Sequence, residues 1–332
     1  MGKKELGLLV LILVIGAATA TWEPLFLSPQ NLLNLANLTG LFGIFSIGIG
    51  LVIITGGIDL SVGSMFALLG VIFIDLLSNY EWPWPLALAF VLAAGLGLGA
   101  IQGFLVTRMR IQPFVVTLCG LLIYRGAARY YTNDASMGFG YGGDYATLQW
   151  LVTGRFYGVP FSFLFLMLVA AVMSVVLHRS VFGRYLYAVG KNEEAARFSG
   201  IRTGRVIAGA YILCGMLAGI TTVFLVFYTN SVSPSSFGNF YELYGIAAAV
   251  LGGCSLRGGE GSIVGIVLGT ILLQVLQNLV NIVGIPSLLN FAVMGTVILL
   301  GVLVDQQLQR QKVRRLAKVT QKPGRVGLPE QA

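Results

Sequence analysis

Residues 206–228 read VIAGAYILCGMLAGITTVFLVFY, a run without a single charged side chain. A helix needs about 20 apolar residues to cross the hydrocarbon core of a bilayer, and this run is long enough. Similar runs recur along the chain, which is 56% hydrophobic and 10% charged, with a mean hydropathy of +0.85. A soluble domain carries about 25% charged residues. The composition therefore predicts one all-α integral membrane protein rather than several soluble domains.

The apolar runs predict about ten transmembrane helices. They cover residues 6–21, 36–55, 62–77, 85–106, 112–128, 160–177, 206–228, 243–254, 263–283 and 287–304. The eighth run is short, which fits either a half-span or an earlier start. We expect a polytopic domain over residues 1–305 and a basic tail at 306–332. Residues 3–20 have features of a cleavable signal, but an uncleaved first helix makes the number of spans even.

The basic residues are distributed very unevenly between the two sides of this topology. With the N-terminus inside, all but three of the 21 Lys and Arg lie in inner segments, and the exceptions are Arg125, Arg129 and Arg155. Inner loops of membrane proteins are enriched in Lys and Arg. We therefore expect both termini in the cytoplasm. The net charge of +8 then has an explanation that involves no nucleic acid.

The residues that usually build enzyme and metal sites are sparse. The three cysteines, Cys119, Cys214 and Cys254, all lie in apolar runs, which indicates packing rather than a disulfide framework. His178 is the one histidine, so a histidine-based metal site is not expected. The acids are scattered rather than clustered. We therefore expect neither a metal site nor a catalytic site in this chain.

Residues 178–205, which we call the central loop, form a polar segment between two apolar runs. They read HRSVFGRYLYAVGKNEEAARFSGIRTGR and hold six of the 21 Lys and Arg. Asn192 can cap a short helix over residues 193–198, and Glu193 and Glu194 suit the positive end of its dipole. A short capped helix between two membrane segments is suited to docking into a cleft on a soluble partner.

Residues 56–64 read GGIDLSVGS and are unusually polar for a chain this apolar. Asp59 can cap the following helix by accepting hydrogen bonds from the N–H groups of residues 61 and 62. Alternatively, a carboxylate at a helix break can form part of an ion or substrate site. A related glycine-rich run, GGCSLRGGEGS, occupies residues 252–262.

Small and polar residues also recur at helical spacing inside the apolar runs. Glycines at 95, 99 and 103, and at 261, 265 and 269, predict close approach of helix backbones in lipid. Four amides share one face of the ninth run: Gln274, Gln277, Asn278 and Asn281. Amides facing lipid would be costly, so this amide stripe faces protein or water. It either bonds helices together or lines a translocation path.

Two of these motifs are familiar. The nonapeptide at 56–64 resembles the signature of the permease subunits of bacterial ribose-type sugar ABC importers. The pattern Glu194-Ala195-Ala196-x3-Gly200 resembles the loop by which importer permeases engage their ATPase. The similarity covers residues 6–305. It implies a fold similar to the vitamin B12 permease, a type II ABC importer bundle of about ten helices, working as a dimer of two copies or two related permeases.

The resemblance also implies partners and residue roles. A cytoplasmic ABC ATPase, commonly with two cassettes in one polypeptide, would bind ATP and Mg, and a periplasmic or lipid-anchored protein would bind the sugar. The chain itself would bind no cofactor and would lie in the bacterial inner membrane among lipid. The residues expected to couple to the ATPase are Asn192, Glu193, Glu194, Ala195, Ala196, Arg197 and Gly200. Those of the signature loop, residues 56–64, are Gly56, Gly57, Asp59, Leu60, Ser61, Gly63 and Ser64.

The source of energy can be addressed without the resemblance. The pattern Gly-x4-Gly-Lys-Ser/Thr occurs nowhere in the chain, so a Walker A loop is absent and energy must come from a partner or an ion gradient. Ion coupling usually needs buried ionisable groups, and few acids approach the spans. We therefore expect a passive gate worked through the helix at 193–198, and the resemblance implies that the solute is a sugar. The alternatives are import of branched-chain amino acids or another small polar solute, or an ion-coupled carrier using Asp59.

Overall fold

The computed structural model describes residues 2–139 and 145–284, together with single positions between 289 and 299. The chain divides into two compact units, Met1–Pro286 and Ser287–Ala332. The first unit contains all the elements named below. The predicted tail at 306–332 and most of the predicted span at 287–304 lie outside the described residues.

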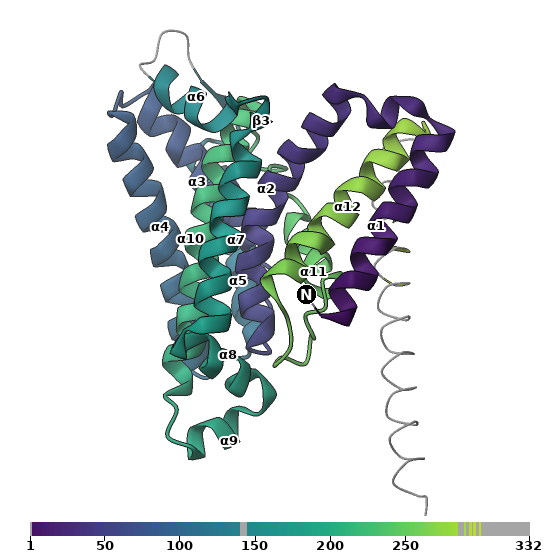
Figure 1. Ribbon diagram of the computed structural model, residues 1–332. Helices are drawn as coiled ribbons and strands as arrows, with labels where there is room; N and C mark the ends of the chain where they lie inside the picture. Colours follow the sequence, from purple (N-terminus) through teal and green to yellow (C-terminus); the bar gives the residue numbers. More distant parts are fainter. Residues whose placement is uncertain are drawn as a thin grey trace, which may run out of the picture. The chain divides into compact units, whose positions relative to one another are not determined.

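The first unit is built from α-helices joined by short connections (Figure 1). The helices are α1 (Lys3–Trp22), α2 (Pro29–Ile54), α3 (Val62–Ser78), α4 (Trp84–Thr107), α5 (Pro113–Tyr131), α6 (Ala146–Thr153), α7 (Phe161–Arg179), α8 (Val181–Lys191), α9 (Glu193–Phe198), α10 (Thr203–Thr229), α11 (Tyr241–Leu251) and α12 (Ile263–Ile282), with a 3-10 turn η1 (Pro24–Leu27). Four two-residue strands form two antiparallel ladders. In these, β1 (Met137–Gly138) pairs with β4 (Ser231–Val232), and β2 (Arg155–Phe156) pairs with β3 (Val159–Pro160). The predicted all-α class is confirmed.

Helices α2, α3 and α10 form the interior of the unit. Residues 39–54 of α2 are buried without interruption, and almost all of α3 is buried. Helix α10 packs against α4, α2 and α3. Helices α1 and α4 are exposed along much of their length. An apolar surface of this kind on the outer helices is expected of a protein that meets lipid.

The described residues include six helices long and apolar enough to cross a membrane: α1, α2, α4, α7, α10 and α12. Helices α3 and α11 are apolar but shorter. Helix α11 replaces the predicted run at 243–254, and its 11 residues make it the half-span that the short run allowed. The expected number of ten spans is therefore not established by these helices.

The structure corrects or extends three details of the prediction. Helix α2 begins at Pro29 rather than at residue 36, because Ser28 caps it by accepting a hydrogen bond from the Asn31 N–H. The central loop contains a second helix, α8, which the glycines at 183 and 190 had concealed. The long connection at 130–158, between the fifth and sixth predicted runs, contains α6 and strands β1 and β2.

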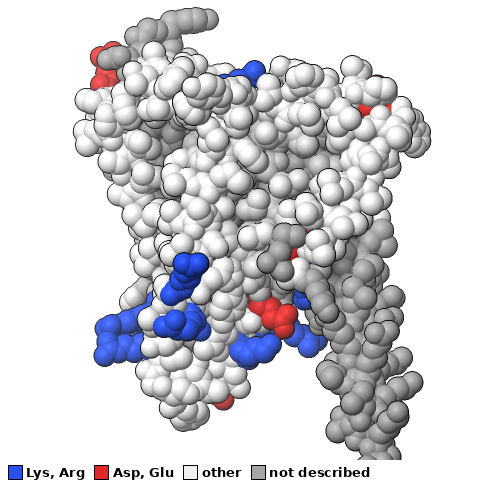
Figure 2. All heavy atoms as spheres, viewed as in Figure 1, with Lys and Arg blue, Asp and Glu red and all other residues white. Residues whose placement is uncertain are grey.

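The two ends of the unit differ in charge. Helices α8 and α9 lie at one end and α6 lies at the other (Figure 1). On the face shown in Figure 2, most of the visible Lys and Arg side chains gather around the end with α8 and α9. The N-terminal end of α1 lies toward this basic end as well (Figure 1). We refer below to the basic end and to the opposite end of the unit.

Helices α4 and α10 approach one another backbone to backbone. A Cβ atom added to Gly95 would lie 2.5 Å from the Gly215 carbonyl oxygen, and one added to Gly99 would overlap the Tyr211 carbonyl oxygen. A Cβ on Gly103 would lie 2.8 Å from the Ala208 Cα. The predicted close packing at 95, 99 and 103 is thus observed, and α10 is the partner helix.

This contact gives a first prediction. Gly99→Ala should lower the free energy of unfolding by about 1–3 kcal/mol, because the new methyl group overpacks the α4–α10 contact. The measurement is thermal unfolding of the purified protein in detergent. Gly97→Ala is the matched control, since a Cβ there meets nothing within 4 Å. Equal unfolding temperatures for the two variants would contradict the prediction.

Candidate coupling site

The helix predicted over residues 193–198 is present as α9, with the predicted cap. The Asn192 side chain accepts a hydrogen bond of 3.0 Å from the Ala195 N–H. At the other end, the Ile201 N–H donates to the Ala196 carbonyl oxygen at 3.1 Å. This closing bond requires Gly200 to adopt a φ of +84°, which glycine reaches without steric cost. The local sequence therefore fixes both ends of α9.

Most, but not all, of the α9 residues that we expect to couple to the ATPase are exposed. Glu194, Ala195 and Arg197 are exposed, as a docking surface requires. Ala196 is only 5% exposed, so its small side chain packs inside this chain and is not available for close approach by a partner. Phe198, which the sequence analysis overlooked, is 85% exposed at the end of the helix. A large apolar side chain in so polar a loop is the signal that could have identified it.

Glu193 has a partner within the chain. Its carboxylate accepts a hydrogen bond of 3.0 Å from the Thr203 hydroxyl at the start of α10. The bond spans the turn between α9 and α10. A displacement of α9 would therefore pull directly on α10, the helix that packs against α4, α2 and α3.

The middle of the central loop, where α8 ends, contacts the end of α2 through glycines. A Cβ on Gly190, near the end of α8, would overlap the carbonyl oxygen of Ile54, the last residue of α2. The Gly259 N–H donates to that same oxygen at 2.8 Å. A Cβ on Gly258 would lie 2.8 Å from the Gly56 nitrogen. We call this meeting of residues 54–56, 190 and 258–259 the glycine junction.

Side-chain hydrogen bonds and ion pairs at the basic end also connect the segments of the glycine junction. The Tyr187 hydroxyl donates to the Gly261 carbonyl oxygen at 2.7 Å. Burial raises the pKa of Tyr187 to about 12, so the hydroxyl keeps its proton at neutral pH and remains a donor. Glu260 pairs with Lys191 at 3.3 Å and with Lys4 at 3.6 Å. These ion pairs are about half exposed and contribute little stability individually.

The signature loop at 56–64 is buried from Ser61 onward and at Gly57 and Asp59, while Gly56 is exposed, and the loop is hydrogen-bonded to three helices. The Asp59 carboxylate accepts bonds from the Ser61 N–H at 2.9 Å and from the Ser61 hydroxyl at 2.7 Å. Both side chains have 0% exposure. The predicted bond from the residue 61 N–H is therefore present, directly before α3 begins at Val62. The bond predicted from the residue 62 N–H is not among the described ones, and the N-cap of α3 is Ser61, whose side chain makes no capping bond. Asp59 therefore closes a turn within the loop rather than capping α3 itself.

The residues that hold the signature loop were not identified from the sequence. The Ile58 carbonyl oxygen accepts a bond of 3.2 Å from Thr117 on α5 and one of 3.4 Å from Tyr211 on α10. Gln102 on α4 donates to the Ser61 hydroxyl at 2.5 Å. Each of these is an isolated polar residue in an apolar helix, and that isolation is the signal that could have found them.

A cavity of about 630 Å³ brings the signature loop and α9 together. Gly56 and Gly57 line it from the loop, and Glu193, Glu194 and Arg197 line it from α9. The turn between α4 and α5 and the start of α10 complete the lining, with Arg110, Ile111, Gln112, Pro113, Thr203, Gly204 and Ile207. Two of the three predicted groups of site residues thus share one polar cavity.

The amide stripe lies elsewhere, on α12. Gln274 is buried, Gln277 and Asn278 are half-buried, and Asn281 is exposed. Asn278 and Asn31 of α2 exchange two hydrogen bonds, of 2.7 and 2.9 Å. For Asn278, the structure therefore supplies the contact expected from an amide that bonds helices together.

Comparison with known proteins assigns the chain to a family. Residues 31–303 match the family described as the permease component of branched-chain amino acid transport systems. The chain belongs to this permease family. No solved structure matches it.

Individual relatives of this permease align over almost their full length. It is 39% identical over 301 residues to the ribose import permease protein RbsC of Escherichia coli strain K12, covering 91% of this chain and 93% of that protein. The Bacillus subtilis ribose import permease protein RbsC is 38% identical over 302 residues, covering 91% of each chain. The Escherichia coli K12 xylose transport system permease protein XylH is 32% identical over 373 residues, covering 93% and 95%. The permease is a multi-pass membrane protein.

The glycine junction gives a second prediction. Gly190→Ala should separate α8 from the end of α2, because no space exists for a methyl group beside the Ile54 carbonyl oxygen. We expect at least a severalfold increase in backbone hydrogen exchange at Gly259, whose N–H bonds to that oxygen, measured by mass spectrometry. Gly126→Ala is the control, since a Cβ there meets nothing within 4 Å. Unchanged exchange at residue 259 in Gly190→Ala would show that the junction tolerates a side chain.

The Asn31–Asn278 pair gives a third prediction. Asn278→Leu should lower the free energy of unfolding by about 1–2 kcal/mol, because the Asn31 amide loses its partner. Changing both residues to Leu should cost less than the sum of the two single changes, because neither amide is then left unpaired. The measurement is a double-mutant cycle by thermal unfolding in detergent. Strict additivity would mean that the pair contributes no coupling.

Proposed function

We propose that this permease is the transmembrane subunit of an ATP-driven ABC importer that carries a monosaccharide across the bacterial inner membrane. The observation that carries the proposal is the 39% identity to the Escherichia coli ribose import permease over 91% of this chain. The alignment runs through the signature loop and the central loop together. Similarity confined to apolar helices would be weaker support, because apolar composition recurs in unrelated membrane proteins.

The proposed substrate class is a pentose or a related hexose or polyol. Two relatives that align over almost their full length are named for ribose and for xylose, both neutral pentoses. The second candidate is a branched-chain amino acid, because the family description names that substrate. A free amino acid carries an ammonium and a carboxylate, whereas a sugar offers only hydroxyl groups. The two candidates are therefore distinguishable by direct uptake measurements.

The proposed energy source is a cytoplasmic ABC ATPase, with two cassettes in one polypeptide, that binds ATP and Mg. The absence of a Walker A loop from the sequence supports a separate motor. Helix α9 would dock on this ATPase through Glu194, Arg197 and the exposed ring of Phe198. Asn192 and Gly200 would hold the helix in shape, because they form its two ends.

The proposed mechanism transmits motion from α9 along two connections. One passes through the Thr203–Glu193 bond into α10. The other passes along α8 to the glycine junction and so to the start of the signature loop. Both connections end on the signature loop, because Tyr211 of α10 bonds to the Ile58 carbonyl oxygen and the glycine junction includes Gly56. Closure of the ATPase would thus shift α3 and α10 relative to α2, and access would alternate between the two sides of the membrane.

The proposed assembly extends the family resemblance noted from the sequence. We infer a dimer of two copies or two related permeases, about ten helices in each, with a fold like that of the vitamin B12 permease. Both termini would lie in the cytoplasm, which puts the basic end of the unit on the inner side, as the positive-inside rule requires. A periplasmic or lipid-anchored sugar-binding protein would deliver sugar at the opposite end. Gln277 and Asn281, for whose side chains no hydrogen bond is among the described ones, are proposed to face the path.

The test is uptake by proteoliposomes containing the permease, its ATPase and its sugar-binding protein, supplied with radiolabelled ribose, xylose or leucine. We expect accumulation of a sugar that requires both ATP and the binding protein. Omitting the ATPase should abolish accumulation, because the permease has no motor of its own. A mixture with a catalytically inactive ATPase is the matched control.

The alternative outcomes are equally specific. Uptake of leucine in place of either sugar would support the branched-chain amino acid assignment. Accumulation driven by a proton or sodium gradient without the ATPase would make the protein a secondary carrier and overturn the proposal.

A further inference from the structure

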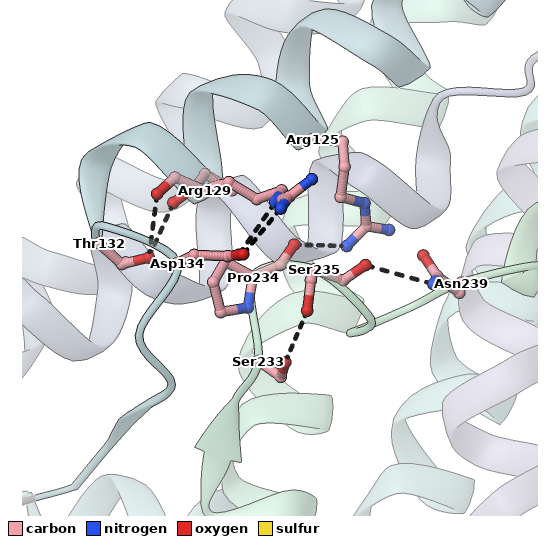
Figure 3. Close-up of polar contacts among 9 residues, drawn as sticks. Arg125, Arg129, Thr132, Asp134, Ser233, Pro234, Ser235 and Asn239 are labelled. Carbon is pink, nitrogen blue, oxygen red and sulfur yellow. Dashed lines mark hydrogen bonds and ion pairs between the residues drawn. The ribbon is translucent and has the colours of Figure 1, made fainter.

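Arg125 is the cation on α5 that points into the protein. It is half-buried, whereas Arg129, one turn further along the same helix, is exposed (Figure 3). The Arg125 guanidinium donates to the carbonyl oxygens of Pro234 at 3.0 Å and Phe237 at 2.8 Å. It also reaches the Gly63 carbonyl oxygen at 3.5 Å. Arg125 therefore connects three segments: α5, residues 233–240 between β4 and α11, and the first turn of α3.

Each of these bonds is made to backbone. Within the described residues, no carboxylate forms a salt bridge with Arg125. A guanidinium presents its N–H donors in a fixed planar fork, so carbonyl oxygens must be placed at matching positions. Three carbonyl dipoles also offset part of the cost of burying the charge. Arg125 consequently holds the position of a loop through its backbone, while the Glu242 carboxylate interacts with the same guanidinium electrostatically without forming a salt bridge.

The loop at 233–240 rests directly on the signature loop. A Cβ on Gly238 would lie 2.5 Å from the Gly63 carbonyl oxygen, and one on Gly63 would overlap both the Gly238 carbonyl oxygen and the Glu242 carboxylate. Gly63 lies two residues after Ser61 and four after Asp59. A movement of the loop at 233–240 toward α3 therefore meets the backbone of its first turn directly, because no side chain lies between the two.

The loop is also held in a strained shape. Phe240, which immediately precedes α11, has a φ of +66°, a value that bulky residues rarely adopt. Its side chain is 49% exposed. Strain of this kind persists only where the surroundings impose it, and it is often found at segments that switch between two states.

The loop at 233–240 also has an exposed surface. Ser235, Ser236 and Asn239 are exposed and carry neutral hydrogen-bonding groups. Figure 3 shows Ser235 and Asn239, which are joined by a hydrogen bond from the Asn239 amide to the Ser235 carbonyl oxygen. The adjacent chain is fixed by the β1–β4 ladder, in which Met137 opposes Val232 and Gly138 opposes Ser231. The exposed residues of the loop at 233–240 thus lie between the β1–β4 ladder and α11.

We propose that Arg125 is a positioning residue that transmits displacement of the loop at 233–240 into the first turn of α3. The inference rests on the proposed function, and the loop would be displaced by the sugar-binding protein through a neutral, hydrogen-bonding face. Pressure on the exposed serines would move the carbonyl groups that Arg125 holds. The movement would then reach Gly63 and the signature loop, whose other end is the glycine junction.

Arg129 supplies a matched control on the same helix. It pairs with Asp134 through two hydrogen bonds, of 2.9 and 2.7 Å, at the surface (Figure 3). This bonding lowers the pKa of Asp134, so the pair is charged at neutral pH. Exposed pairs contribute little to stability. Arg129 contacts neither the loop at 233–240 nor Gly63 in the described bonds, so its removal leaves the proposed connection intact.

The experiment measures ATP hydrolysis by the assembled importer with and without its sugar-loaded binding protein. Arg125→Gln should lower the stimulation by the binding protein at least about fivefold, while basal hydrolysis and the yield of assembled complex stay unchanged. Arg125→Lys should restore part of the stimulation, because an ammonium can still donate to some of the carbonyl oxygens. Arg129→Gln should behave like the unaltered protein.

The possible results distinguish failure of the proposed function from failure of the inference about Arg125. If the unaltered importer shows no stimulation by a binding protein, the proposed function fails. If it does, and assembled Arg125→Gln or Arg125→Lys is stimulated to the same degree, the inference is overturned. If both variants lose assembly or basal hydrolysis along with stimulation, Arg125 is a folding determinant, and the inference is overturned as well.

Discussion

The structure depends on direct contact between backbones at positions without a side chain. In lipid, helices gain nothing from hiding apolar surface from water, so close packing and hydrogen bonds must hold them together. Glycine supplies that closeness at Gly99 between α4 and α10, at Gly190 between α8 and the end of α2, and at Gly63 below the loop at 233–240. A contact between two backbones is also stiff, because no rotatable side chain lies between them. The same constraint that stabilises this bundle therefore suits it to transmit movement.

The signature loop is the place where these contacts converge. It breaks the helical path between α2 and α3 inside an apolar bundle, so its exposed backbone and side-chain groups need partners. Thr117, Tyr211 and Gln102 supply them from three different helices. The Asp59 carboxylate accepts its hydrogen bonds from Ser61, in the same loop. A shift in any of the three helices must therefore change the environment of the loop.

The two ends of the unit reach this loop through different residues. From the basic end, α8 arrives through the glycine junction, which combines close backbone contacts with the bond from the Gly259 N–H to the Ile54 carbonyl oxygen. From the opposite end, the Arg125 guanidinium bonds to three carbonyl oxygens, beside the close backbone contact of Gly63 with Gly238. Both connections therefore pair backbone contact with hydrogen bonds, and the second adds a buried part of a charged side chain that donates several bonds at once.

The sequence alone determined the membrane class, the approximate positions of most helices, the uneven distribution of basic residues and the capped helix α9. These are local properties, since apolar runs, charges and caps act over one helix or one turn. The sequence also pointed to both glycine-rich runs and to close packing at Gly95 and Gly99. It did not reveal that Gly190 meets Ile54, that Gln102 reaches Ser61, or that Arg125 binds the carbonyl groups of residues 234 and 237. Those contacts join residues far apart in the chain, and only the tertiary structure could decide them, because a glycine or a lone polar side chain shows that a partner is needed without naming it.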